Sequence, residues 1–337
     1  MKVPHAMRMI ALCVAIIPVA ALSQVTAVAP YTVSVFASSV TNVYFQPDSI
    51  AVLDNHIFIG FGNGAAPDGS DGKSSTIVEY DRNGNVITSY SVKGHNDGLK
   101  VDPRTQQLWA MQNEDGNPNL VIIDPVAHTQ TVYTFATPAH GGGYDDIAFS
   151  GGNVYFSCSN PQYNPNTKPA IVRGQISGTM VNVTPVLMGN ATATDIPTDS
   201  PVTLNLQDPD SMKFDPLGDL VLDSQADAEL IIVHHPGAID QTAYHVALTL
   251  DGASVQIDDT VYAGASHGVI LVSDRDGETI YSISRDIFAP SDAYSAALTS
   301  VARTDLGTGV LTNVVTGMVS PHGMAFLRDE GAQGRKK

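Results

Sequence analysis

Six short motifs along the chain carry an acidic residue or a histidine at the same place, where an apolar strand begins. Two examples are Pro47-Asp48-Ser49-Ile50 and Pro209-Asp210-Ser211-Met212. The residues at this second motif position are Asp48, Asp97, Asp145, Asp210, Asp258 and His322. Carboxylate oxygens suit Ca²⁺ or Mg²⁺, and nearby histidines would admit Zn²⁺ or Mn²⁺. A cation held there could polarise a carbonyl or activate a water, with a neighbouring carboxylate as general base.

The spacing of the motifs indicates a repeat. Successive second positions are 49, 48, 65, 48 and 64 residues apart. A unit of about 48 residues is the length of a four-stranded propeller blade. Further short apolar runs follow each motif, and Gly, Asn, Asp and Pro turns separate them, as an antiparallel blade requires.

We therefore predict an all-β protein, a single β-propeller of four-stranded antiparallel blades. Six motifs predict six blades, and five or seven stay open as alternatives. We expect Val269 to Val272 to be the second strand of the fifth blade. Tyr31 to Phe36 should close the ring as an outer strand of the last blade, and a short helix could form near Asp286 to Ala297.

This topology would bring the motif residues to one channel mouth. The start of an inner strand and the end of the strand that returns beside it share one face of the disc. The same face should receive further side chains for binding a substrate: His95, His140, Asn113 and Asn160. Converging carboxylates repel one another unless they are protonated or a cation neutralises them. The alternative is structural, because an Asp at a strand start often bonds to backbone N–H groups.

Two segments resemble the SMP-30/gluconolactonase-like six-bladed propellers. His95 to Trp109 is similar to the family's Asn-Asp-Gly…Val-Asp-Pro…Trp signature. Pro209 to Leu220 is similar to its Pro-Asp-Gly-Met…Gly-Asn-Leu segment. The resemblance implies one divalent cation at the channel mouth and hydrolysis of lactones or related esters. It also implies that Asp210 is a metal ligand and the general base, and that Asn96 touches the substrate pocket.

The expected site combines these inferences. Asp48, Asp145, Asp210 and Asp258 are the candidate ligands of one cation, with Ca²⁺ expected before Zn²⁺, Mn²⁺ or Mg²⁺. Asp210, Asp97 and His322 are the candidate catalytic residues. Asp145 and Asp48 depart from the family, which usually has Asn and Glu at those places.

Two functions remain open. The first is a metal-dependent hydrolase of lactones or esters. The second is a non-catalytic propeller that binds a ligand or partner protein through its face loops. Related propellers with NHL-type repeats share much of the pattern without being enzymes. The histidines His95, His140 and His322 also leave a zinc lyase as a further possibility.

The first 23 residues form an expected signal peptide. The basic residues Lys2 and Arg8 precede an uncharged apolar run, Met9 to Leu22. This run is too short to span a bilayer comfortably. Cleavage would leave a propeller over residues 24–327 and a polar tail over 328–337. We expect an exported protein, periplasmic or extracellular, without a membrane span after cleavage. Only Cys158 would then remain, so no intramolecular disulfide could form.

The charge narrows the partners. The chain has 337 residues, with 34 Asp and Glu against 17 Lys and Arg, and a formal net charge of −17. Binding to nucleic acid is disfavoured, because phosphates need a basic face. We expect a monomer that binds a small molecule.

Overall fold

All regular structure in the described part of the chain is β-strand. The computed structural model describes residues 24–329. The expected signal peptide and residues 330–337 of the expected tail lie outside this range. Within it, no helix is long and apolar enough to cross a membrane. The prediction of an all-β propeller is confirmed.

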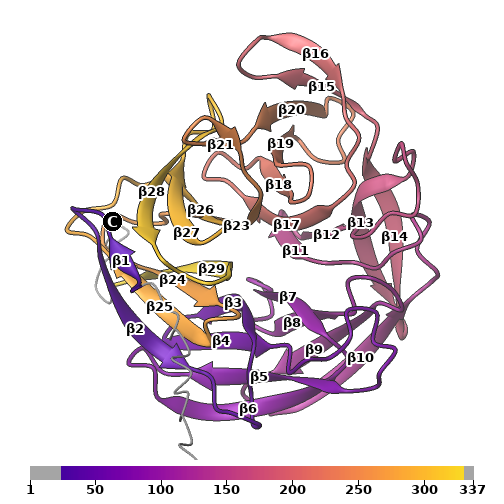
Figure 1. Ribbon diagram of the computed structural model, residues 1–337. Helices are drawn as coiled ribbons and strands as arrows, with labels where there is room; N and C mark the ends of the chain where they lie inside the picture. The colour runs from indigo at the N-terminus through magenta and orange to yellow at the C-terminus, as the bar shows by residue number, and fades with distance from the viewer. Residues whose placement is uncertain (1–23, 330–337) are drawn as a thin grey trace, which may run out of the picture.

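The strands are arranged in antiparallel four-stranded blades around a central axis (Figure 1). The inner strands are β3 (Pro47–Leu53), β7 (Asn96–Val101), β11 (Ile147–Ser150), β17 (Pro209–Phe214), β23 (Ile257–Tyr262) and β29 (Pro321–Arg328). We name each blade by its inner strand. Neighbouring inner strands contact one another in chain order, and β29 contacts β3 to close the ring.

Four blades follow chain order from the axis outwards. The β3 blade continues with β4 (His56–Phe61), β5 (Ser74–Tyr80) and β6 (Val86–Lys93), and the β7 blade with β8 (Leu108–Gln112), β9 (Asn119–Asp124) and β10 (Thr129–Phe135). The β11 blade continues with β12 (Asn153–Ser157), β13 (Pro169–Ser177) and β14 (Met180–Met188), and the β17 blade with β18 (Leu220–Ser224), β19 (Glu229–His234) and β20 (Thr242–Ala247). A hairpin of β15 (Thr192–Asp195) and β16 (Ser200–Thr203) extends the β17 blade.

The core lies between the faces of neighbouring blades. Phe58 and Ile77 of the β3 blade pack with Leu108 and Val121 of the β7 blade in one apolar cluster. The second strand of each blade therefore has a neighbouring blade on both of its faces. In β8, for example, every residue is buried. Such strands read as continuous apolar runs instead of alternating patterns.

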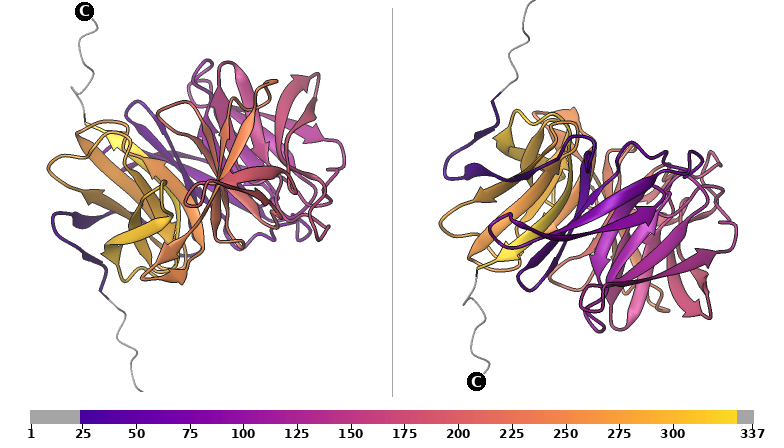
Figure 2. Two further views of the ribbon diagram at one scale, coloured as in Figure 1. Left: turned by 90° about the horizontal axis from the view of Figure 1, so that it is seen from above. Right: turned by 90° about the horizontal axis from the view of Figure 1, so that it is seen from below.

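In the last two blades the order of strands in the chain differs from their order in space. The hairpin that follows β23 in the chain belongs to the β29 blade. The inner strand β23 pairs with β26 (Ala293–Ala297), and β27 (Ser300–Thr304) and β28 (Val310–Thr316) complete that blade. The hairpin of β24 (Gly268–Asp274) and β25 (Thr279–Ser284) instead joins the β29 blade. The outermost strand of the β29 blade is β2 (Thr32–Ser38), so strands from the early and the late part of the described chain complete the same blade (Figures 1 and 2).

Two sequence predictions are therefore wrong and one is confirmed. Val269 to Val272 lies in β24, which belongs to the last blade and not to the fifth. No helix forms near Asp286 to Ala297, because the small residues of β26 pair beside β23 and are all buried. The outer strand expected at Tyr31 to Phe36 is present as β2. Three two-residue strands complete the fold: β1 (Thr26–Ala27), β21 (Thr249–Leu250) and β22 (Ala253–Ser254).

Candidate metal centre at the channel mouth

The second motif positions gather where the inner strands begin. We call this set, Asp48, Asp97, Asp145, Asp210, Asp258 and His322, the acidic mouth. Their charges act on one another across blades. Burial raises the pKa of Asp97 well above its ordinary value, and Asp145 and Asp48 raise it further. Burial does the same for Asp210, with Asp145 and Asp258 adding to the rise.

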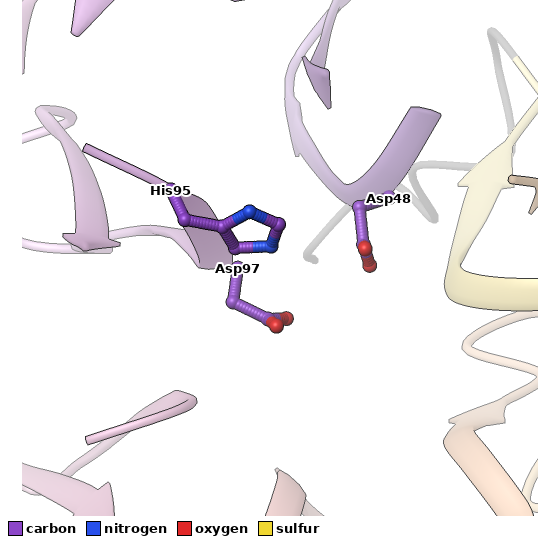
Figure 3. Close-up of side chains that lie close together, drawn as sticks. All are labelled: Asp48, His95 and Asp97. Atoms are coloured by element: carbon purple, nitrogen blue, oxygen red, sulfur yellow. The ribbon is translucent and has the colours of Figure 1, made fainter. Parts of the chain in front are cut away.

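One group in the mouth has the geometry of a metal site. Asp48, His95 and Asp97 can each offer one ligand atom, and these atoms lie within 4.8 Å of one another. Figure 3 shows the three side chains around one space, with Asp48 coming from a different blade. Asp48 is 5% exposed and His95 is 3% exposed, whereas Asp97 is partly exposed, so the group has two shielded members and one that solvent can reach.

The tautomer of His95 is fixed by its surroundings. Its Nδ1 lies 3.0 Å from the carbonyl oxygen of Ala65, which can only accept a hydrogen bond. Nδ1 must therefore carry the proton, and a neutral ring presents the lone pair of Nε2. The nearest acid to Nε2 is Glu114, whose Oε1 is 3.7 Å away and too far for a hydrogen bond. Nε2 is thus available as a metal ligand.

A second group contains the two motif residues of the last blades. Asp48, Asp258 and His322 also offer atoms within 4.8 Å of one another. His322 Nδ1 lies 2.7 Å from Asp258 Oδ1, and His322 Nε2 lies 3.1 Å from Ser320 Oγ. Gln225 donates its side-chain N–H to the same Asp258 oxygen at 2.9 Å. Burial alone would lower the pKa of His322, but Asp258 and Asp48 raise it to about 9.

Four carboxylates of the mouth have no hydrogen-bond donor among residues 24–329. They belong to Asp48, Asp97, Asp145 and Asp210, and the nearest cationic atom to Asp48 Oδ1 is His322 Nδ1 at 3.9 Å. Asp145 and Asp210 are only 6% and 9% exposed. Burial, followed by the charge of Glu114, raises the pKa of Asp145 well above its ordinary value. Their oxygen atoms keep some surface open to the channel, so water or a cation there can pair with them.

The mouth also contains two charged residues outside the predicted set. Glu114 follows β8, and its Oε2 is buried without a partner in the described range. Burial raises the pKa of Glu114 to about 8. Arg275 follows β24, and its buried Nε also lacks a partner there. Burial alone would lower the pKa of Arg275, but Asp48 and Asp97 raise it.

The residues expected to bind substrate lie around the mouth in different ways. Only His95 faces the acids. The amide of Asn113 caps its own loop, accepting from the His95 backbone N–H and donating to the Asn117 carbonyl. Asn96 is fully buried and donates to the Met111 carbonyl, because strand alternation turns it away from Asp97.

His140 and Asn160 occupy the neighbouring loops. His140 is 1% exposed, and its Nε2 lies 2.6 Å from the carbonyl oxygen of Gly143. Burial lowers the pKa of His140, so it braces the glycine-rich link before Tyr144 as a neutral ring. Asn160 is exposed and has a positive φ of 49°.

One signal in the sequence could have found further mouth residues. The residue directly before the first motif position is His95 in the β7 blade, Asp208 in the β17 blade and Ser320 in the β29 blade. All three reach the mouth. Burial raises the pKa of Asp208 to about 6, with Asp115 and Asp258 among the charges that add to the rise.

Comparisons with known proteins give no family for the chain. No protein-family model and no curated protein matches it. Among solved structures, the periplasmic gluconolactonase PpgL of Pseudomonas aeruginosa is 10% identical with a TM-score of 0.47, over 83% of this chain and 88% of that one. Virginiamycin B lyase of Staphylococcus aureus is 10% identical with a TM-score of 0.44, over 89% of each chain. A streptogramin B lyase is 10% identical with a TM-score of 0.46, over 87% and 73%.

Proposed function

We propose that the acidic mouth binds one divalent cation and hydrolyses lactones or esters. The observation that carries the proposal is the set of four mouth carboxylates that have no hydrogen-bond donor in the described range, Asp48, Asp97, Asp145 and Asp210. Protonating all of them would leave a cluster of neutral acids with unused hydrogen-bonding capacity. A divalent cation satisfies their oxygens and removes their mutual repulsion together.

Asp48, Asp97 and His95 are the residues that would hold the cation. Asp145 and Asp210 lie outside this group and would act on it through their charge. Carboxylates alone would suit Ca²⁺. The Nε2 lone pair of His95 in the same group favours Mn²⁺ or Zn²⁺, because these ions accept mixed oxygen and nitrogen ligands. Asp258 is less suited to be a ligand than predicted, because His322 and Gln225 already bond to its Oδ1.

When bound, a divalent cation would polarise the substrate carbonyl and make an attacking water more acidic. The protein's own groups then divide the proton transfers. Asp210, which has no competing hydrogen bond, accepts the proton of the attacking water as general base. His322 is protonated at neutral pH because Asp258 and Asp48 favour its charged form. Asp258 holds Nδ1 and fixes the orientation of the ring. The Nε2 proton, which faces Ser320 Oγ in the free protein, passes to the leaving oxygen.

The direct test is metal content together with turnover. Protein dialysed against chelator should take up one equivalent of Mn²⁺ or Zn²⁺, measured by elemental analysis. It should then hydrolyse members of a panel of γ-lactones, δ-lactones and nitrophenyl esters. Asp97→Asn and Asp210→Asn should lose metal or activity. Asp240→Asn is the matched control, because Asp240 is two-thirds exposed in a surface pair with His235.

The outcomes separate the two functions. Stoichiometric metal without turnover on any lactone or ester would favour the non-catalytic ligand-binding propeller. A wild-type protein that binds no divalent cation would remove the basis of both the metal site and the hydrolase.

A further inference from the structure

A cavity opens at the end of the channel away from the acidic mouth. Its volume is about 320 Å³, at the lower end of the range for small-molecule sites. It is lined by the later residues of the inner strands, including Ile50, Phe149, Phe214 and Phe326. The inner strands begin at the acidic mouth, so this cavity lies towards their carboxyl ends.

The polar residues of this cavity follow the repeat. The residues three places after the second motif position all line it: Ala51, Lys100, Ala148, Lys213, Val261 and Ala325. The residues one place after the second motif position are Ser49, Gly98, Asp146, Ser211, Asp259 and Gly323. Lysines therefore occur in alternate blades, and each is followed by an aspartate in the next blade.

The two lysine and aspartate pairs, Lys100 with Asp146 and Lys213 with Asp259, form equivalent ion pairs between neighbouring blades. We call the two pairs together the belt, and each pair one arm of it. Lys100 donates to both carboxylate oxygens of Asp146 at 2.7 Å, and Asp146 accepts the backbone N–H of Met212. Lys213 donates to both oxygens of Asp259 at 2.7 and 2.6 Å, and Asp259 accepts the backbone N–H of Met324. Each arm thus ties together three consecutive blades.

The third arm of this pattern is missing. By the same spacing, its lysine would stand at Ala325 and its aspartate at Ser49. Alanine leaves open the space that a lysine side chain would fill, and Ala325 lines the cavity beside Ala51. The cavity is therefore a specific gap in the belt, not only the general end of a channel.

One N–H group of the two belt lysines has no acceptor in the described range. Lys213 uses its third N–H on the carbonyl of Met324 at 3.0 Å. Within the described range Lys100 has acceptors only on Asp146, so one of its three N–H groups has no partner. The two lysines and two aspartates balance in charge, and the acidic mouth adds negative charge nearby. An anion would therefore gain little here, whereas a neutral acceptor oxygen suits the free N–H.

We propose that this cavity binds an uncharged, largely apolar small molecule that carries one carbonyl oxygen. Its apolar body would fill the gap at Ala325, and its carbonyl would accept from Lys100. The site is separate from the acidic mouth and does not rest on the proposed hydrolase.

The probe is 2-acetylnaphthalene, a neutral aromatic ketone, followed by equilibrium dialysis and ultraviolet absorbance. We expect saturable binding of one equivalent, at least tenfold tighter than that of the carboxylate 2-naphthoate. Chelator should leave this binding unchanged, because the metal site is at the other mouth. The paired change Ser49→Asp with Ala325→Lys, which completes the third arm, should weaken binding at least tenfold. Val310→Lys, an exposed site on β28, should not.

Two further variants protect the test from misfolding. Ala148→Leu fills the cavity without adding charge, and it should also weaken binding at least tenfold. Lys100→Met with Asp146→Asn removes the donor and its partner together, and it should reduce the preference for 2-acetylnaphthalene over 2-ethylnaphthalene. No saturable binding to the wild-type protein, or equal affinity in the folded cavity-filled variants, would overturn the proposal. Tighter binding of 2-naphthoate would overturn it as well.

Discussion

His322 and Asp258 face each other across the joint between two blades, with His322 Nδ1 2.7 Å from Asp258 Oδ1. They occupy the same motif position in consecutive blades, so the only histidine among the six positions is held by the acid next to it in the ring. Because Nδ1 is bonded to Asp258, the other ring nitrogen, Nε2, faces Ser320 Oγ. This arrangement suits a histidine that delivers a proton in one direction.

We expect His322→Gln to lower kcat by at least about 100-fold, the usual contribution of a general acid. Glutamine keeps a hydrogen bond to Asp258 but cannot deliver a proton. The measurement is steady-state hydrolysis of the best lactone or ester at saturating metal. His235→Gln serves as control, because His235 is exposed on the surface. Unchanged kcat in His322→Gln would remove His322 from the mechanism.

Asp97→Asn should raise the free energy of unfolding of the metal-free protein and reduce the stabilisation that metal provides. In chelator, replacing an acid that lacks a donor and is repelled by Asp145 and Asp48 should raise the free energy of unfolding by about 1–3 kcal/mol. With metal at 100 times the dissociation constant, the wild-type protein should gain about 2.7 kcal/mol, and the variant should gain much less. Urea unfolding in both conditions measures this. A variant that is less stable in chelator would contradict the lack of a partner for Asp97.

The stability of the metal-free protein should depend on pH through Glu114. Burial raises its folded pKa from 4.5 to about 8. A raised folded pKa means that the folded state prefers the protonated acid. This contribution to stability is complete below about pH 4.5 and is lost as pH rises towards 8.

The wild-type protein in chelator should therefore lose stability between pH 5 and pH 8 more steeply than Glu114→Gln. The measurement is the urea midpoint at each pH. Parallel pH profiles for the two proteins would show that Glu114 is not the responsible group.

Lys213→Met should destabilise the fold strongly, by about 3–5 kcal/mol, because it leaves the buried Asp259 without its cation. Adding Asp259→Asn should recover most of this loss, since the pair is then replaced by neutral groups. Lys73→Met should change the free energy of unfolding by less than about 1 kcal/mol, because the Lys73 side chain is 57% exposed. Urea unfolding of the variants tests the belt independently of any ligand.

Much of the fold could be predicted because the motifs repeat at blade length. The turn between β5 and β6 shows how local the signal is: Asp81 accepts the backbone N–H groups of Asn83 and Asn85, and Gly84 takes a positive φ of 79°. The placement of the hairpin of β24 and β25 in the β29 blade could not be predicted. Nothing in the apolar run of Val269 to Val272 tells a strand of one blade from the same strand of the next, because the choice depends on which neighbour it packs against.

The candidate site could be predicted in position but not in detail. The convergence of the acidic positions follows from topology, and the sequence locates it. Whether a side chain faces the channel depends on one step of strand alternation, which separates Asn96 from Asp97. Roles set by hydrogen bonds between blades, such as that of Asp258 with His322, need coordinates, since the partners are far apart in sequence.

The β29 blade is assembled from three distant parts of the chain: β2 near the start, the hairpin of β24 and β25, and β29 at the end. Contacts between residues so far apart in sequence form slowly, because a long loop must close first. During synthesis this blade has to wait until β29 has left the ribosome. His322 therefore joins the acidic mouth only when the whole ring can close, and a chain truncated before β29 would lack both the closure and His322.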